Sequence, residues 1–189
     1  MKKNIILSGV GGQGILTMAA VIDLAAMNLG LYVKQAEVHG MSQRGGAVES
    51  HLRISSEEIY SDLIPQGKAD VILSLEPMEA LRYLPFLSPE GVIITAKEPY
   101  KNIPNYPDET ELLQTVEKTA THVLVEAARL AKQAGSPKTY NIVMLGAAAP
   151  YLDIEHQELE RAITQYFSAK GESVVNMNLK AFRLGLPNN

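Results

Sequence analysis

Short apolar runs and longer helix-forming segments alternate along this chain. The run Asn4–Ser8 leads into a glycine-rich turn over residues 9–14, and good helix formers then occupy Ile15–Asn28, just before Gly30. Leu31–Ala36 is typical of a second strand. A strand, a glycine turn, a helix and a strand in this order predict a right-handed βαβ unit and therefore a parallel sheet.

Strict alternation marks the next segment, Ala47–Ile54. One face carries mostly apolar residues and the other carries Glu49, His51 and Arg53. This period of two predicts a strand with one face toward solvent or toward an interface.

The strand-then-helix order continues to the C-terminus. We expect strands at Ala69–Leu75, Gly91–Ala96, His122–Val125 and Ser173–Val175. We expect helices at Glu76–Leu84, Glu109–Lys118, Glu126–Gln133, Tyr140–Ala149 and Ile154–Lys170, a last turn at Leu179–Leu184, and a proline-containing surface connection at Glu98–Asp108. The pattern predicts a single-domain, Rossmann-like α/β three-layer sandwich with a mostly parallel sheet and a helical C-terminal third.

Composition narrows the possible chemistry. The chain has 189 residues, a formal net charge of −4 and no cysteine. This length predicts one domain, 1–189. Without cysteine the chain cannot form disulfides, thiolate zinc sites or a self-contained iron–sulfur cluster. The acidic balance gives no footprint for nucleic acid, and the apolar run at the start is too short for a signal peptide or a membrane span. We therefore expect a cytoplasmic protein.

The first glycine-rich turn is the clearest chemical motif. Gly9, Gly11 and Gly14 match the GxGxxG pattern of dinucleotide-binding turns, between an expected strand and an expected helix. Backbone N–H groups at such a turn can bind a phosphate. The alternative is that the glycines only let the helix pack against the sheet. Glu37 stands where a ribose-binding acid of an NAD enzyme would lie, but Gln13 is unusually long for such a turn.

A second glycine-rich loop follows at Glu37–Gly46, which a classical dehydrogenase lacks. Its Arg44 suits a bidentate contact with phosphate or carboxylate, and Met41 equally suits a protein interface. The remaining possibility is a solvated turn. The histidines, His39, His51, His122 and His156, show no metal-ligand spacing, and no catalytic motif is present. The sequence thus indicates neither a metal site nor catalytic residues.

These two loops resemble those of the gamma-type subunits of the 2-oxoacid:ferredoxin oxidoreductases. The resemblance spans nearly the whole chain, and the string HGMSQRGG at residues 39–46 is similar to that of the indolepyruvate:ferredoxin oxidoreductase beta subunit. The segments that carry it are Gly9–Gly14, Ala36–Val48, His51–Ile54, Tyr60–Pro65, Ala69–Asp70, Leu75–Pro77, Asn141–Gly146 and Asn178–Phe182.

The resemblance implies an enzyme that decarboxylates an aryl 2-oxoacid, passes electrons to ferredoxin and forms an acyl-CoA. Thiamine diphosphate and the iron–sulfur clusters are then expected on a larger partner subunit, and this chain is not expected to be active alone. The candidate contacts with the phosphates of coenzyme A, or with the partner, are Gly9, Gly11, Gly12, Gln13, Gly14, Ser42, Gln43, Arg44, Gly45 and Gly46. A homodimer of the isolated chain, a free-standing NAD(P)-binding oxidoreductase and a non-catalytic scaffold remain as alternatives.

Overall fold

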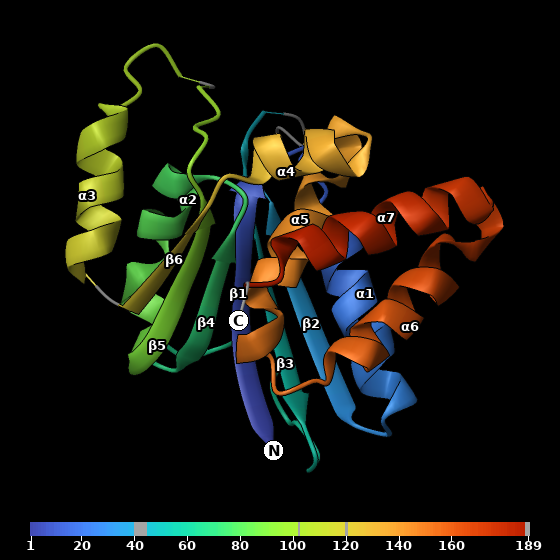
Figure 1. Cartoon of the computed structure of the whole chain (residues 1–189). Helices are drawn as coiled ribbons and strands as arrows, with labels where there is room; N and C mark the ends of the chain where they lie inside the picture. Colours follow the sequence, from blue (N-terminus) through green and yellow to red (C-terminus); the bar gives the residue numbers. More distant parts are fainter. Residues whose placement is uncertain (40–44, 102, 120, 188–189) are drawn as a thin grey trace.

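A six-stranded sheet with the order β2-β3-β1-β4-β5-β6 forms the centre of the molecule (Figure 1). The computed structural model describes residues 1–39, 45–101, 103–119 and 121–187, the side chain of His39 excepted. Strand β3 runs antiparallel to both β1 and β2, whereas β1, β4, β5 and β6 pair in parallel. The strands are β1 (Lys2–Val10), β2 (Tyr32–His39), β3 (Ala47–Ser55), β4 (Ala69–Ser74), β5 (Leu87–Ala96) and β6 (Thr121–Val125).

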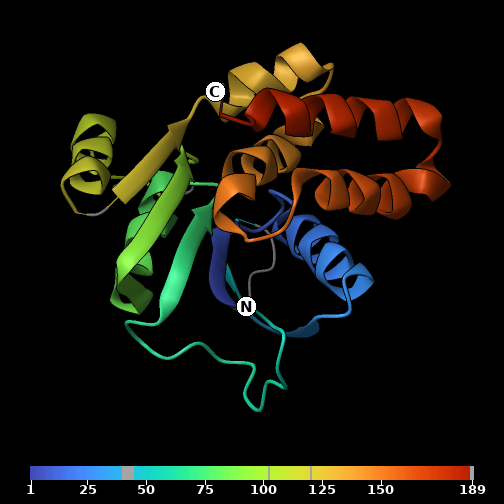
Figure 2. The same ribbon diagram turned by 60° about the horizontal axis from the view of Figure 1, so that its bottom comes forward.

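Helices cover both faces of the sheet, so the expected three-layer sandwich is confirmed (Figure 2). Helices α1, α5, α6 and α7 lie on one face, while α2 and α3 lie on the other. Helix α4 packs against α5 and α7. The helices are α1 (Ile15–Asn28), α2 (Pro77–Arg82), α3 (Glu109–Thr119), α4 (Ala127–Ala134), α5 (Tyr140–Ala148), α6 (His156–Phe167) and α7 (Glu172–Gly185). Short 3-10 turns occupy Leu84–Phe86, Pro137–Thr139, Ala149–Tyr151 and Ser168–Lys170.

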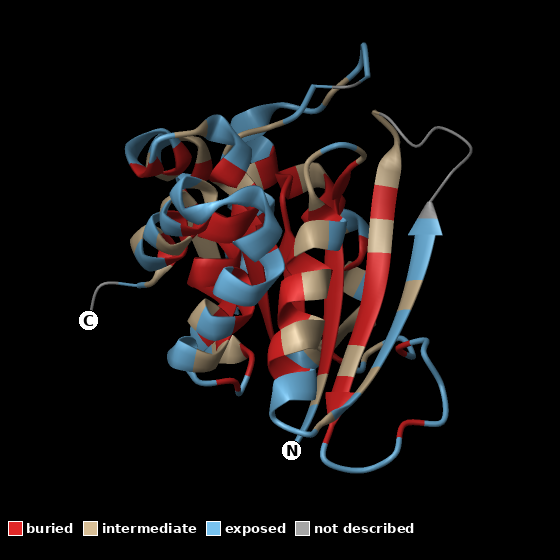
Figure 3. Ribbon diagram, turned by 90° about the vertical axis from the view of Figure 1, so that its right-hand side faces the viewer, coloured by how far each residue is buried: buried red, intermediate tan, exposed pale blue. Residues whose placement is uncertain are grey.

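The apolar runs of the central strands are explained by this double cover. Side chains on a strand alternate between faces, and in β1 Ile5 and Leu7 join the larger core while Ile6 joins the smaller one. The same division separates Leu73 from Ile72 in β4. Figure 3 shows the central strands buried along most of their length and the edge strand β2 mostly exposed.

The expected βαβ unit is wrong in one respect. Strands β1 and β2 run in the same direction but do not pair, because β3 lies between them. β2 and β3 form an antiparallel ladder from Tyr32 opposite Ser55 to His39 opposite Val48. The strand therefore continues through Glu37, which the sequence placed in a loop.

The polar face of β3 is also not as expected. His51 is only 3% exposed. Its Nδ1 accepts the Ile64 N–H at 3.0 Å, and the Phe86 ring packs edge-on against it. The connection between β3 and β4, which has no regular structure, covers this face of β3. The hydrogen bond from Ile64 to His51 therefore replaces one that water would have made.

The predicted C-terminal strand does not exist. Residues 173–175 and the predicted turn at 179–184 belong to one helix, α7. The buried residues Val175, Asn178, Ala181, Phe182 and Gly185 recur every three or four positions, which is the helical period. The other predicted strands and helices are present with ends shifted by a few residues, and 98–101 and 103–108 contain no regular element, as expected.

Candidate functional site

The site lies where β1 and β4 end side by side. These neighbouring strands are parallel, but the helices that follow them, α1 and α2, lie on opposite faces of the sheet. Such a switch point leaves a crevice at the carboxyl ends of the strands, where open α/β sheets bind ligands. The first glycine-rich turn leaves β1 at this crevice.

Gln13 holds the turn in shape. Its Oε1 accepts the Val10 N–H at 2.7 Å, and its Nε2 donates to the Leu75 carbonyl at the end of β4, at 3.2 Å. A Cβ on Gly9 would lie 2.8 Å from Gln13 Oε1 and 3.1 Å from Leu75 Cβ. The side chain that looked too long for a dinucleotide turn thus fastens β1 to β4, and Gly9 leaves room for it.

Gly14 joins the turn to helix α5. Its φ of 91° is in the left-handed region, which favours glycine. Its carbonyl accepts Asn141 Nδ2 at 3.0 Å, and a Cβ on Gly14 would stand 2.6 Å from that nitrogen. The sequence therefore needs glycine here both for the backbone angle and for the approach of Asn141.

The end of the second glycine loop, Gly45 and Gly46, lies beside the first. The Gly11 N–H donates to the Gly46 carbonyl at 2.8 Å, and the Gly45 N–H donates to the Gly11 carbonyl at 3.2 Å. These two bonds extend the pairing of β1 with β3. Ser42, Gln43 and Arg44 lie outside the described residues.

The start of α1 is open to an anion. No acidic residue occupies its first turn, and no side chain caps it. Within the part of the chain that the structure describes, the N–H groups of Gly12, Gly14, Ile15 and Leu16 have no acceptor. Unpaired N–H groups and the helix dipole together favour phosphate or carboxylate at this position.

A cavity of about 760 Å³ opens directly above this helix start. Its walls are the glycine turn at 12–14, the β5–α3 connection at 98–100, the segment 136–141 and the facing parts of α6 and α7. This volume is in the range of cofactor and ligand sites. The walls come from segments far apart in sequence, so the cavity exists only in the folded chain.

Two cations and one carboxylate set the charge of the cavity. Lys138 and Lys170 line it, and neither forms an ion pair with another described residue. Lys170 Nζ lies 5.3 Å from the centre of the Phe167 ring. Glu98 is engaged, because its Oε1 accepts the Ala128 N–H at 3.0 Å in the first turn of α4. The net charge of these three side chains is therefore positive.

Tyr140 forms part of the cavity wall. Its hydroxyl lies 3.2 Å from the Leu75 carbonyl oxygen and 3.5 Å from Glu98 Oε2. Burial, together with the nearby carboxylates of Glu98 and Glu76, raises the pKa of Tyr140 well above its usual value. The hydroxyl accordingly stays protonated and acts as a donor.

A smaller hollow of about 460 Å³ lies on the other side of the glycine turn. Glu37 lines it with Gly11, Gly12 and Gly14. In a classical NAD-binding sheet the strand bearing the ribose acid lies next to the first strand. Here β3 intervenes, which moves Glu37 about 9–10 Å sideways from β1. This strand order does not favour the nicotinamide dinucleotide alternative.

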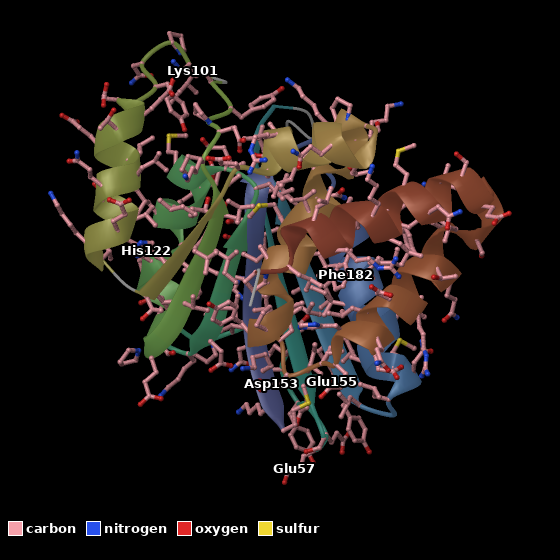
Figure 4. All side chains as sticks on the ribbon, in the orientation of Figure 1. Glu57, Lys101, His122, Asp153, Glu155 and Phe182 are labelled. Carbon is pink, nitrogen blue, oxygen red and sulfur yellow. The ribbon has the colours of Figure 1, made fainter. Side chains whose placement is uncertain are left out.

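The three histidines whose side chains the structure describes do not converge on the site, and the side chain of His39 lies outside the described residues. His51 is buried under Phe86, His122 lies on the edge strand β6 (Figure 4), and His156 begins α6. Among the described residues no group of three or more His, Asp or Glu could hold a metal ion. An iron–sulfur cluster does not fit this chain, since it has no cysteine. In the same residues no helix is long and apolar enough to cross a membrane.

Several residues of the cavity were not foreseen from the sequence. Tyr140, Asn141 and Lys170 belong to segments that the periodicity assigned only to helices, and Lys138 lies between two of those helices. Asn141 could have been identified, because it begins one of the segments that carry the family resemblance. For the lysines, no local pattern separates them from ordinary surface charges.

The fold and the site together define an α/β domain with a glycine-rich turn and an uncapped helix start at the switch point of its sheet. The family described as pyruvate ferredoxin/flavodoxin oxidoreductase matches residues 4–187. The chain therefore belongs to this family.

Individual relatives support the same family assignment. The chain is 41% identical to the indolepyruvate oxidoreductase subunit IorB of Archaeoglobus fulgidus, over 98% of this chain and 94% of that protein. Identity to the same subunit of Thermococcus kodakarensis is 37%, over 97% and 94%. The gamma subunit of a keto/oxoacid ferredoxin oxidoreductase from Geobacter sulfurreducens has a TM-score of 0.69 at 27% identity, over 97% of this chain and 95% of that one.

A longer protein contains the same fold. The 2-oxoglutarate:ferredoxin oxidoreductase from Magnetococcus marinus, solved with 2-oxoglutarate, coenzyme A and succinyl-CoA bound, has a TM-score of 0.78 at 24% identity. The match covers 97% of this chain but only 30% of that polypeptide. The fold of this chain can thus form part of a larger polypeptide.

Proposed function

We propose that this protein is the small, non-thiamine subunit of a cytoplasmic indolepyruvate:ferredoxin oxidoreductase. The full-length similarity to indolepyruvate oxidoreductase subunits supports an aryl 2-oxoacid as the substrate. The overall reaction decarboxylates the oxoacid, transfers electrons to ferredoxin and forms an acyl-CoA.

A larger partner subunit carries the redox cofactors in this proposal. The lack of cysteine supports this division, because an iron–sulfur cluster needs sulfur ligands that this chain does not have. Thiamine diphosphate also belongs to the partner, so the isolated chain should not turn over the oxoacid. The active site is then completed across the subunit interface.

Coenzyme A is the ligand that we assign to this chain. The observation that carries the assignment is the uncapped start of α1, which opens into the 760 Å³ cavity beside Lys138 and Lys170. Coenzyme A carries phosphates for the backbone N–H groups and the lysines. Its flexible arm can extend from this cavity toward a thiamine site on the partner.

Reconstitution tests the subunit assignment. The cluster-bearing partner is titrated with this chain, and ferredoxin reduction is measured with indolepyruvate and coenzyme A, with 2-oxoglutarate and pyruvate as comparison substrates. We expect stoichiometric co-elution and activity only when both chains are present. Full activity of the partner alone would contradict the assignment.

Amide exchange tests the coenzyme A contact in the assembled enzyme. We expect coenzyme A to slow exchange in peptides covering residues 11–17 and 136–141, whereas peptides of β2 serve as an internal reference. If Gly12→Ala disturbs assembly and leaves the dependence on coenzyme A unchanged, the chain is a scaffold and not a ligand-binding subunit.

A further inference from the structure

Leu75 and Glu76, the two residues that follow β4, hold three walls of the cavity together, although neither residue lines the cavity. The Leu75 carbonyl accepts hydrogen bonds from Gln13 of the glycine turn and from the Tyr140 hydroxyl. The next residue, Glu76, reaches the third wall, which is the β5–α3 connection. Leu75 and Glu76 therefore lie behind the site and hold its parts together.

The two carboxylate oxygens of Glu76 contact different elements, α2 and the β5–α3 connection. Glu76 is 0% exposed. Its Oε2 accepts the Glu79 N–H at 2.8 Å and so caps α2. Its Oε1 accepts the Tyr100 N–H at 3.4 Å and the Tyr106 hydroxyl. No lysine or arginine forms an ion pair with it in the described part of the chain, so these three donors are what offset its burial.

The described residues of the β5–α3 connection have few other attachments. Residues 98–101 and 103–108 contain no helix or strand. Figure 4 shows this connection, with Lys101 labelled, extending away from the sheet. Glu98 is bonded to the start of α4, and Lys101 forms an ion pair with Glu109 at 2.6 Å. The hydrogen bonds of Glu76 with the Tyr100 N–H and the Tyr106 hydroxyl therefore determine the position of Tyr100 in the cavity wall.

We infer that Glu76 is a positioning residue, which acts through Tyr106 and the Tyr100 N–H to fix the β5–α3 wall of the coenzyme A cavity. This inference rests on the proposed function. A carboxylate needed only to cap α2 could be a shorter aspartate, which caps helices equally well. The longer glutamate is required because its second oxygen must reach the connection.

Two variants separate the cap from the wall. Glu76→Asp keeps the charge and a capping oxygen but withdraws the carboxylate by one methylene. Tyr106→Phe removes one hydroxyl and leaves Glu76 with both backbone donors. Tyr60→Phe is the matched control, since Tyr60 is 87% exposed and lies in the connection between β3 and β4.

The first measurement needs no ligand. Amide exchange of the full chain should become about 3- to 10-fold faster in peptides covering residues 98–106 for both variants, while peptides of α2 change little for Tyr106→Phe. The double variant should show less than the combined effect, because both changes break the same contact. Unchanged exchange in both single variants would overturn the role of Glu76.

The second measurement uses the assembled enzyme. Both variants should raise the KM for coenzyme A by about 3- to 10-fold, with kcat at saturating coenzyme A and the KM for the oxoacid unchanged. Faster exchange without a change in that KM would overturn the link between the wall and the ligand. Failure of the proposed function gives a different result, because coenzyme A would then protect no peptide of the unaltered chain.

Discussion

Gly146 of α5 and Gly185 of α7 face each other where the two helices touch. A Cβ on Gly146 would lie 2.1 Å from the Phe182 carbonyl oxygen and 3.1 Å from the Gly185 Cα. A Cβ on Gly185 would lie 2.0 Å from the Val143 carbonyl oxygen. The backbones therefore pack directly against each other, and this contact fixes α7, one of the helices that close the cavity.

Gly146→Ala tests this packing by the sign of its effect. Alanine is the better helix former by about 1 kcal/mol, so an uncrowded site would become more stable. We expect instead a loss of about 1–3 kcal/mol in the free energy of unfolding, because the methyl group forces the helices apart. Urea denaturation measures it. Gly30→Ala, with open space around an added Cβ, should cost only the strain of its left-handed φ of 72°.

Gln13→Glu should weaken both the stability of the fold and the binding of coenzyme A, although the two side chains have nearly the same size. The carboxylate can still accept the Val10 N–H, but it cannot donate to the Leu75 carbonyl and it adds negative charge at the helix start. We expect a lower melting temperature and a KM for coenzyme A raised by about 10-fold or more. Gln13→Met, which loses both hydrogen bonds without adding charge, separates the two causes in the same assays.

Lys138→Ala and Lys170→Ala should each weaken coenzyme A binding. Each removes a positive charge that no described carboxylate neutralises, so we expect the KM for coenzyme A to rise by about 3- to 10-fold. The effect should shrink at high salt, because these side chains are exposed. Lys34→Ala on the edge strand β2 is the control. Equal KM values for all three variants would remove the lysines from the site.

Asp23 gives the fold a pH dependence. Burial raises its pKa from 3.8 to about 7, and its Oδ1 is buried with no partner among the described residues. The folded state thus binds the proton more tightly than the unfolded state does. This contribution is fully present below about pH 4 and is lost as the pH rises to about 7.

Asp23→Asn should remove that dependence. The difference in melting temperature, variant minus wild type, should grow from near zero below about pH 4 to a plateau of several degrees above pH 7. Thermal unfolding across this pH range measures it. A constant difference at every pH would show that Asp23 does not titrate as its burial requires.

Arg44→Ala tests the second glycine loop. We expect weaker association with the partner subunit or a higher KM for coenzyme A, since a charge-assisted hydrogen bond contributes about 1.5–3 kcal/mol. Titration calorimetry with the partner and steady-state kinetics distinguish the two. If both quantities are unchanged, Arg44 has no part in the site.

Much of the architecture was predictable because it depends on local pattern. The apolar runs of β1, β4 and β5 predicted strands, and the glycines after β1 predicted the turn at the start of α1. The sequence failed where the outcome depended on distant partners. Residues 173–175 look like a short strand, but they form part of α7, in which Val175 is buried on the same side as Asn178 and Phe182.

The candidate site divides in the same way. The glycine pattern identified Gly11, Gly12 and Gly14, whose backbone angles and small size are local properties. The placement of Lys138 and Lys170 beside them was not predictable, because those residues follow more than a hundred positions later.

The sequence by itself determined an α/β domain with a glycine-rich turn after its first strand and without cysteine for redox chemistry. Tertiary structure decided that β3 separates β1 from β2, that Glu37 is therefore displaced sideways from β1, and that Glu76 holds the cavity wall from behind. The physical reason is the distance along the chain over which each interaction acts. Backbone preference and apolar period act over a few residues, whereas strand order and cavity walls are chosen by the burial and hydrogen bonding of the whole folded chain.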